Sequence, residues 1–358
     1  MPAPEADNEI ENASLAFGEH ATINIYTFAA VMSTADNNTR AWQPALFAEP
    51  AGFDRAKLAA GVRRLAEERV YIGTSSWKYE GWLGQVYTRE RYLERGRFSQ
   101  RLFETACLRE YAETFPIVCG DFSFYQFPSE AYWQRLFRSA PPSLLYAFKV
   151  PEQITVKRFP AHDRYGAAAG QENPTFLNAA LFEDSFLRLL DPYRSQVAVL
   201  IFEFGAFGRG SYERRGQFFE DLAKFLCPLP KQFRYAVEVR NPEFLGPDYF
   251  SCLRDHQAAH VFNAWSKMPE LPVQVRIADA YTSDYSVIRA LLRRGRTYEE
   301  AVRKFAPYEH VQEPNPEARQ AIRDVIGRAR EARQTAFVFV NNRLEGNAPG
   351  TVQAILED

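Results

Sequence analysis

Short apolar runs rich in β-branched and aromatic residues alternate along this chain with longer stretches whose apolar residues recur at helical spacing. Such short runs are typical of buried strands, and the longer stretches are typical of helices that cover a sheet. The pattern predicts eight strands: Val70–Thr74, Ile117–Phe122, Leu144–Val150, Val197–Phe202, Arg234–Val239, His260–Ala264, Val273–Ile277 and Ala336–Val340.

Predicted helices lie between most of these strands. They are Arg97–Thr114, Glu130–Arg138, Thr175–Leu190, Tyr212–Leu226, Tyr249–Ala259 and Glu317–Arg333. This alternation, without a long linker, favours a single α/β domain with a closed (β/α)8 TIM-type barrel over a doubly wound sheet. One connection, Trp265–Pro272, contains two prolines and is too short for a full crossover helix. Either a single turn replaces the helix there, or one strand is wrongly assigned.

The chain divides into three segments. Residues 1–40 are small, acidic and polar and are predicted to be a poorly structured N-terminal extension. Residues 41–69 lead into the barrel and include a helix over Asp54–Arg69 with Asp54 as its cap. The barrel takes residues 70–358, with a long insertion at 278–316 that contains a predicted helix near Asp284–Phe305. Long insertions after barrel strands fall on the catalytic face.

Composition limits the classes of function. The 358 residues carry a net charge of −2, which gives no general attraction to nucleic acid or to anionic membranes. No Lys or Arg precedes Arg40, so we expect no signal peptide, which would carry positive charge at its start. No apolar run approaches the length of a membrane span. The four cysteines form no CxxC pair, and we expect buried, reduced thiols in a cytoplasmic protein.

Polar side chains stand at the carboxyl end of every predicted strand. In a closed barrel these ends meet at one mouth, where barrel active sites lie. In strand order they are Thr74, Ser75, Ser76 and Trp77; Asp121, Ser123 and Tyr125; Lys149; Glu203; Glu238, Arg240 and Asn241; Asn263 and Trp265; Arg276 and Asp279; and Asn341 and Asn342. Inward charges in a barrel can simply pair with one another, but the set as a whole favours a binding or catalytic pocket.

Three of these residues are candidate catalytic groups. Glu238 is predicted to be a general acid or base, and Lys149 to polarise a carbonyl or form a Schiff base. Asp121 is the third, and together with Glu203 and Glu238 it offers a carboxylate site for a hard cation as an alternative. Arg240 is predicted to bind the anionic group of a ligand.

A second signal lies near the end of the chain. Gly346 and Asn347 belong to a turn that opens a final helix, and the start of a helix attracts anions. The turn is therefore either an anion site or an ordinary capped loop. The five histidines show no metal-binding spacing, and no cofactor motif is present.

Five segments resemble the YecE-like family, domain of unknown function 72. They are YIGTSSWKYEGWLGQVY (71–87), VCGDFSFYQFPS (118–129), YAFKVPEQIT (146–155), YAVEVRNPEF (235–244) and FVNNRLEGNAP (339–349). The resemblance implies a TIM barrel but no reaction. It places the family's polar strand ends at Thr74, Ser75, Trp77, Lys149, Glu238, Arg240, Asn341, Asn342, Gly346 and Pro349. Many members have Val-Glu-Ile-Asn at 118–121 and Gln-Leu-Pro-Pro at 202–205, so Asp121 and Glu203 predict an altered pocket.

These observations lead to three hypotheses. The first is an enzyme or binder for a small polar anionic ligand, such as a sugar phosphate or hydroxy acid, at the barrel mouth. The alternative is a nucleic-acid-binding barrel that uses the arginine-rich segment 289–303, although a solvated helix face explains that segment more simply. The third is a scaffold whose mouth is plugged by side chains.

Overall fold

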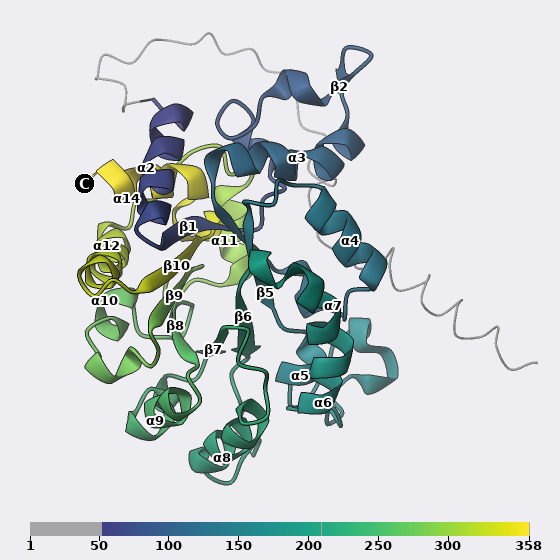
Figure 1. Ribbon diagram of the computed structural model, residues 1–358, viewed down its shortest axis with the longest axis vertical. Helices are drawn as coiled ribbons and strands as arrows, with labels where there is room; N and C mark the ends of the chain where they lie inside the picture. The colour runs from purple at the N-terminus through teal and green to yellow at the C-terminus, as the bar shows by residue number, and fades with distance from the viewer. Residues whose placement is uncertain (1–51, 209, 358) are drawn as a thin grey trace, which may run out of the picture. The chain divides into compact units, whose positions relative to one another are not determined.

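The barrel is formed by eight parallel strands that close on themselves (Figure 1). The structure is a computed structural model that describes residues 52–208 and 210–357, so the predicted extension 1–40 lies outside the described residues. The barrel strands are β1 (Val70–Ser75), β4 (Ile117–Gly120), β5 (Leu145–Lys149), β6 (Val197–Phe204), β7 (Tyr235–Val239), β8 (Ala259–Ala264), β9 (Tyr285–Ala290) and β10 (Thr335–Val340). Each strand pairs with the next in the chain, and β1 closes the barrel against β10. The predicted fold class is confirmed.

The seventh predicted strand is wrong. Val273–Ile277 is not a strand, because Leu271–Gln274 forms the short helix α10. The side chain of Gln274 satisfies the backbone of Asn263 at both its N–H (3.2 Å) and its C=O (2.7 Å). The seventh barrel strand is β9, within the segment predicted to be a helical insertion. The short connection Trp265–Pro272 is thus explained by a misassigned strand.

The predicted insertion at 278–316 is therefore also wrong. The long excursion instead follows β9 and runs from residue 291 to 334 before β10 begins. It contains two helices, α11 (Tyr298–Phe305) and α12 (Pro316–Glu331). A capping box starts α11, in which Thr297 and Glu300 each bond the backbone N–H of the other.

The remaining helices surround the barrel (Figure 1). They are α2 (Arg55–Glu67), α3 (Gln100–Thr114), α4 (Glu130–Arg138), α5 (Glu152–Thr155), α6 (Ala179–Phe182), α7 (Arg188–Leu190), α8 (Arg215–Leu226), α9 (Pro247–Asp255), α13 (Asn342–Glu345) and α14 (Ala348–Glu357). A π-helical turn at Glu183–Leu187 joins α6 to α7, and the hairpin of β2 (Leu93–Glu94) and β3 (Arg97–Phe98) precedes α3. Asp54 caps α2 as predicted, since its side chain accepts a hydrogen bond from the Lys57 N–H at 2.9 Å.

Two apolar cores meet at the barrel wall. The larger one lies between the strands and the helices and is rich in stacked aromatic rings. The smaller one fills the barrel with inward side chains that include Ile117, Cys119, Ala147, Val199, Ile201, Ala236, Val261, Val287, Phe337 and Phe339. Because strand side chains alternate, the next inward positions toward the carboxyl ends carry the polar residues of the mouth. The fold thus places an ionic layer directly on an apolar one.

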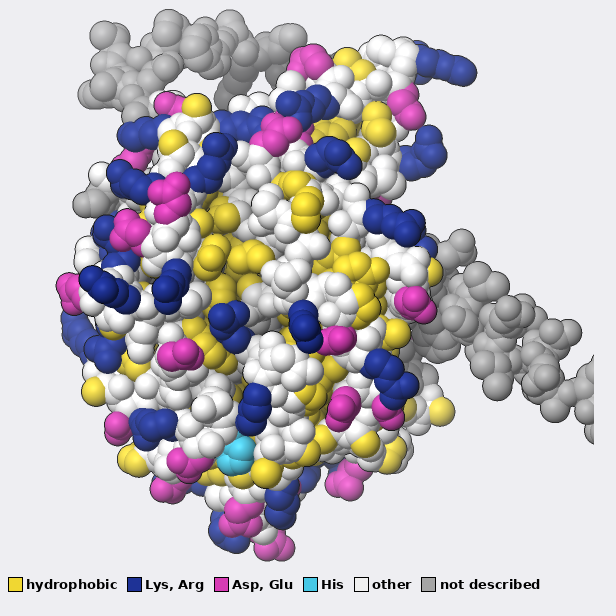
Figure 2. Space-filling model, in the orientation of Figure 1, with side chains coloured by type: hydrophobic (Ala, Val, Ile, Leu, Met, Phe, Trp, Pro, Cys, Tyr) yellow, Lys and Arg dark blue, Asp and Glu magenta, His cyan; other side chains and the backbone are white. Residues whose placement is uncertain are grey.

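The outer surface mixes charges of both signs. On the face shown in Figure 2, Lys and Arg side chains are interspersed with Asp and Glu side chains. No helix among the described residues is both long and apolar enough to cross a membrane. All four cysteines are free thiols; Cys107 and Cys119 are buried, whereas Cys227 is exposed, contrary to expectation.

We predict that His260 makes stability depend on pH. Its ring is buried on β8 and contacts the rings of Tyr249, Phe250 and Phe262, and burial lowers its pKa to about 3. The unfolded chain takes up a proton near the ordinary pKa of about 6.5 that the folded chain does not. The free energy of unfolding should therefore fall as pH drops below that value, and His260→Gln should flatten the fall. Urea titrations between about pH 7 and pH 4 measure this; equal slopes for both proteins would contradict it.

Candidate functional site

Six charged side chains from five strands converge at the carboxyl end of the barrel. They are Asp121, Lys149, Glu203, Glu238, Arg240 and Arg289, here called the mouth network. Glu203 and Glu238 are register partners on the neighbouring strands β6 and β7. Two carboxylates held side by side inside a barrel repel each other unless a cation lies between them.

Arg289 of β9 is that cation. Its side chain is 1% exposed, and one guanidinium nitrogen donates to both Glu203 (2.6 Å) and Glu238. The other terminal nitrogen donates to Oδ1 of Asp121 at 3.1 Å. Arg289 therefore joins β4, β6, β7 and β9 through three carboxylates.

The other two cations complete the network. Lys149 Nζ lies 3.0 Å from Glu203 and 3.8 Å from the centre of the Phe124 ring. Arg240 contacts Glu203 at 2.8 Å and Glu238 at 3.3 Å, and its guanidinium stacks 3.7 Å above the ring of Trp265. Three positive charges thus balance three negative ones.

The electrostatics keep Glu203 and Arg289 charged. Burial alone would raise the pKa of Glu203, but the three cations around it hold the pKa well below its ordinary value. Burial likewise opposes the charge on Arg289, yet its carboxylate partners raise its pKa. Glu203 is therefore an ion at neutral pH and is not available as a proton donor.

The same geometry bears on the predicted cation site. Asp121, Glu203 and Glu238 do come together, but the guanidinium of Arg289 lies among them. Within residues 52–208 and 210–357, no group of three His, Cys, Asp or Glu side chains is placed to hold a metal ion. The three carboxylates pair with the guanidinium of Arg289 instead.

Four further predicted residues keep one buried polar atom without a hydrogen-bond partner in the described part of the chain. These atoms are Oγ of Ser75, Nε1 of Trp77, Oδ1 of Asn263 and Nδ2 of Asn342. A buried polar atom that lacks a partner is costly, and a ligand or water that supplies one relieves the cost. These residues stay candidates for binding.

Other predicted residues, together with the side-chain oxygen of Asn342, are used by the scaffold. Each bonds to a neighbouring loop or caps a helix: Thr74 bonds Tyr111, Asn241 bonds Phe207 and Glu243, Asn341 caps α13, and Asn342 accepts from Trp82 and Ala348. Asn347 caps α14 and donates to Gln85 and Tyr308, and Gly346 takes a left-handed turn (φ 113°) against the backbone of His310. The turn at 346–347 thus has the geometry of a capped, packed loop.

Arg276 and Asp279 do not reach the mouth. They were assigned to the end of a strand that does not exist, and both are exposed in the connection from α10 to β9. Asp279 instead pairs with Arg254 of α9 at 3.6 Å. Misassigning one strand therefore added two residues to the predicted site that do not belong to it.

Two functional candidates were missed. Arg289 was assigned to an exposed basic patch, although the alternation Tyr285, Val287, Arg289 in YSVIRA is a strand signal that would have found it. Arg343 on α13 was not singled out. It makes no ion pair with any described carboxylate, and its buried Nε has no hydrogen-bond partner there.

Arg343 lies in an aromatic setting beside the network. Its guanidinium is 4.4 Å from the centre of the Tyr298 ring. Burial lowers its pKa, but Tyr79, Tyr298, Tyr308 and the nearby Asp121 outweigh burial and raise it overall. Since the mouth network is neutral, Arg343 adds an uncompensated positive charge to the mouth.

The fold and this ionic layer define a TIM-type barrel with a charged mouth, and comparison with known proteins agrees. The family described as "Protein of unknown function DUF72" matches residues 71–358, so the chain belongs to the DUF72 family. A crystal structure of a DUF72 family protein from Thermotoga maritima is similar at 21% identity and a TM-score of 0.51, covering 81% of this chain and 99% of that one. One from Enterococcus faecalis is similar at 14% identity and a TM-score of 0.52, covering 81% and 96%. No curated protein matches the chain.

We predict that Arg289→Met destabilises the protein by about 3–5 kcal/mol, because it leaves three carboxylates, of which Glu203 and Glu238 are buried, with two cations. Adding Glu238→Gln restores the balance of charge, so the double variant should be more stable than Arg289→Met alone. Urea unfolding measures both. Arg254→Met, at an exposed ion pair, is the matched control and should change stability little. A double variant less stable than the single one would contradict the account.

Proposed function

We propose that the protein binds a small polar anionic ligand, of the sugar phosphate or hydroxy acid class, at the mouth of the barrel. The observation that carries the proposal is the half-buried Arg343, which adds a positive charge beside a neutral network. A cation without a carboxylate partner in a partly desolvated setting attracts an anion strongly. Arg343 therefore takes the role that we predicted from the sequence for Arg240, whose guanidinium is already paired with two glutamates.

The rest of the mouth suits the polar body of such a ligand. The side chain of Asp121 is 33% exposed and is placed to accept hydrogen bonds from hydroxyl groups. Tyr125 and Tyr298 are exposed aromatic side chains that can stack on a sugar face. Asp121, rather than Glu238, is the carboxylate that a ligand can reach, because Glu238 has no exposed surface.

The nucleic-acid alternative loses part of the support that it had from the arginine-rich segment 289–303. Arg289 lies inside the barrel and not on a helix face. Arg293, Arg296 and Lys304 share the carboxylate of Glu313. Arg289 is therefore not available to a phosphate backbone, and Glu313 offsets part of the positive charge of the other three cations.

The proposal predicts that Arg343→Gln weakens binding of glycerol 3-phosphate or lactate by about tenfold or more, because a charge-assisted hydrogen bond is lost. Isothermal titration calorimetry measures the affinity, with glycerol as the uncharged probe and Arg254→Gln as the control variant. Equal affinity for the anions in wild type and Arg343→Gln would contradict the role of Arg343. Failure of the wild type to bind either anion would contradict the ligand class.

A further inference from the structure

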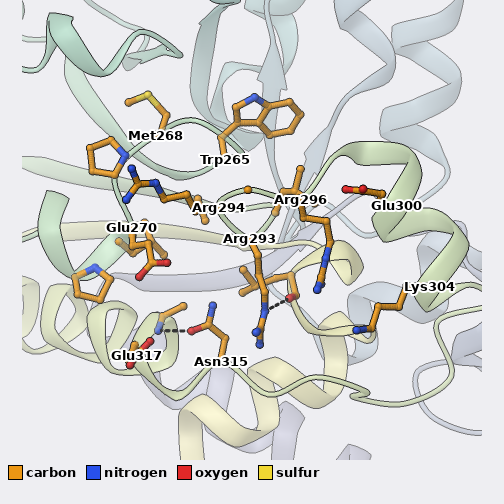
Figure 3. Close-up of a pocket in the computed structure, with 18 residues that line it drawn as sticks. Trp265, Met268, Glu270, Arg293, Arg294, Arg296, Glu300, Lys304, Asn315 and Glu317 are labelled. Carbon is orange, nitrogen blue, oxygen red and sulfur yellow. Dashed lines mark hydrogen bonds between the residues drawn. The ribbon is translucent and has the colours of Figure 1, made fainter.

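A cavity of about 540 Å³ lies beside the mouth, between the loops that follow β8 and β9 (Figure 3). Helix α11 and the start of α12 complete its walls. Its volume is within the range of sites that hold small molecules. None of the residues in the mouth network lines it, so it is a separate site.

The cavity has an apolar floor. Met268, Leu271, Leu292 and Leu344 line it and are buried. The indole of Trp265 stands at its edge (Figure 3). Arg240 of the mouth network covers one face of that indole, so Trp265 separates the cavity from the network. A planar apolar group fits a floor and wall of this kind.

Cationic side chains from the β9 loop and α11 surround this floor. Arg293, Arg294, Arg296 and Lys304 all line the cavity (Figure 3). The carboxylate of Glu313 lies 3.5 Å from Arg293, 2.8 Å from Arg296 and 2.9 Å from Lys304. One carboxylate therefore pairs with three cations. The cluster retains positive charge that an anion can neutralise.

Two of these arginines have N–H groups that remain available to a ligand. Arg294 is exposed and forms no ion pair with the described residues, and the buried NH1 of Arg296 has no hydrogen-bond partner there. Arg293 differs, because it donates to the backbone carbonyls of Leu344, Glu313 and Pro314 and holds the loops together. Arg294 and Arg296 are therefore the residues available to a ligand.

The acidic residues of the cavity compete little for these donors. Glu300 is committed to the N-cap of α11, where the Thr297 backbone lowers its pKa. Glu270 and Glu317 are exposed and form no ion pair with Arg294 or Arg296. Solvent screens exposed carboxylates of this kind.

We propose that this cavity binds a small molecule that combines a planar apolar body with a phosphate or carboxylate group. The body packs on Trp265 and the leucine floor, and the anionic group bonds Arg294 and Arg296. This site is independent of the mouth and of Arg343.

Isothermal titration calorimetry with phenyl phosphate and with benzoate tests the proposal. Phenol and inorganic phosphate represent the two halves of phenyl phosphate. At least one complete probe should bind more tightly than either half. The double variant Arg294→Gln/Arg296→Gln should bind it about tenfold more weakly or worse. Arg294→Gln alone should also weaken binding, and since Arg294 pairs with none of the described carboxylates, this variant is expected to fold. Arg254→Gln, at an exposed ion pair that does not line the cavity, should leave the affinity unchanged.

Three results would overturn the proposal. One is that neither complete probe binds the wild type. Another is equal affinity in the wild type and the double variant. The third is loss of binding in Arg343→Gln with retention in the double variant, which would place the probe in the mouth. A single-stranded oligonucleotide that binds through Arg294 and Arg296, where the small probes do not, would favour a nucleic-acid surface instead.

Discussion

The contact of Arg289 with three carboxylates is the interaction on which the mouth of this barrel depends. Glu203 and Glu238 are register partners on adjacent strands, and both point inward. Without a cation between them, their repulsion and the cost of desolvating them would oppose closure of the barrel there. Arg289 reaches both from β9 and also holds Asp121 from β4. One side chain thus links strands on opposite sides of the barrel.

This arrangement gives the barrel a layered interior. Apolar side chains fill the barrel and exclude water. The ionic layer above them is neutral, because Lys149 and Arg240 balance the charges that Arg289 alone cannot. Arg343 and its tyrosines then stand beside a balanced layer, so the charge of this arginine is not cancelled. The neutrality of the network is what makes Arg343 the anion-binding candidate at the mouth.

Much of the fold could be predicted from the sequence, because seven of the eight strands are short apolar runs with clear alternation. The prediction of the remaining strand failed for a physical reason. Val273–Ile277 has β-branched residues but forms a turn of helix, whereas the true strand β9 ends with an arginine in an inward position. A charged residue there resembles the polar face of a helix until its three carboxylate partners are known. Those partners lie 51 to 168 residues away, so local sequence could not reveal them.

The candidate site could likewise be predicted only in part: its positions were found, but the roles of its residues were not. Asp121, Lys149, Glu203, Glu238 and Arg240 were found from their positions at strand ends, and the structure brings them together. Their roles depend on distances that strand position does not give. Arg240 is a paired ion and Glu238 is fully buried, so our proposal gives the ligand-facing roles to Arg343 and Asp121.

The most direct test of the central claim is a crystal structure of the protein soaked in sodium bromide, with bromide located by its anomalous signal. The account predicts bromide at the guanidinium of Arg343, with Arg289 bonded to Asp121, Glu203 and Glu238 beneath it. A structure in which Asp121 pairs with Arg343, or in which bromide or a metal ion replaces Arg289 among the carboxylates, would contradict it.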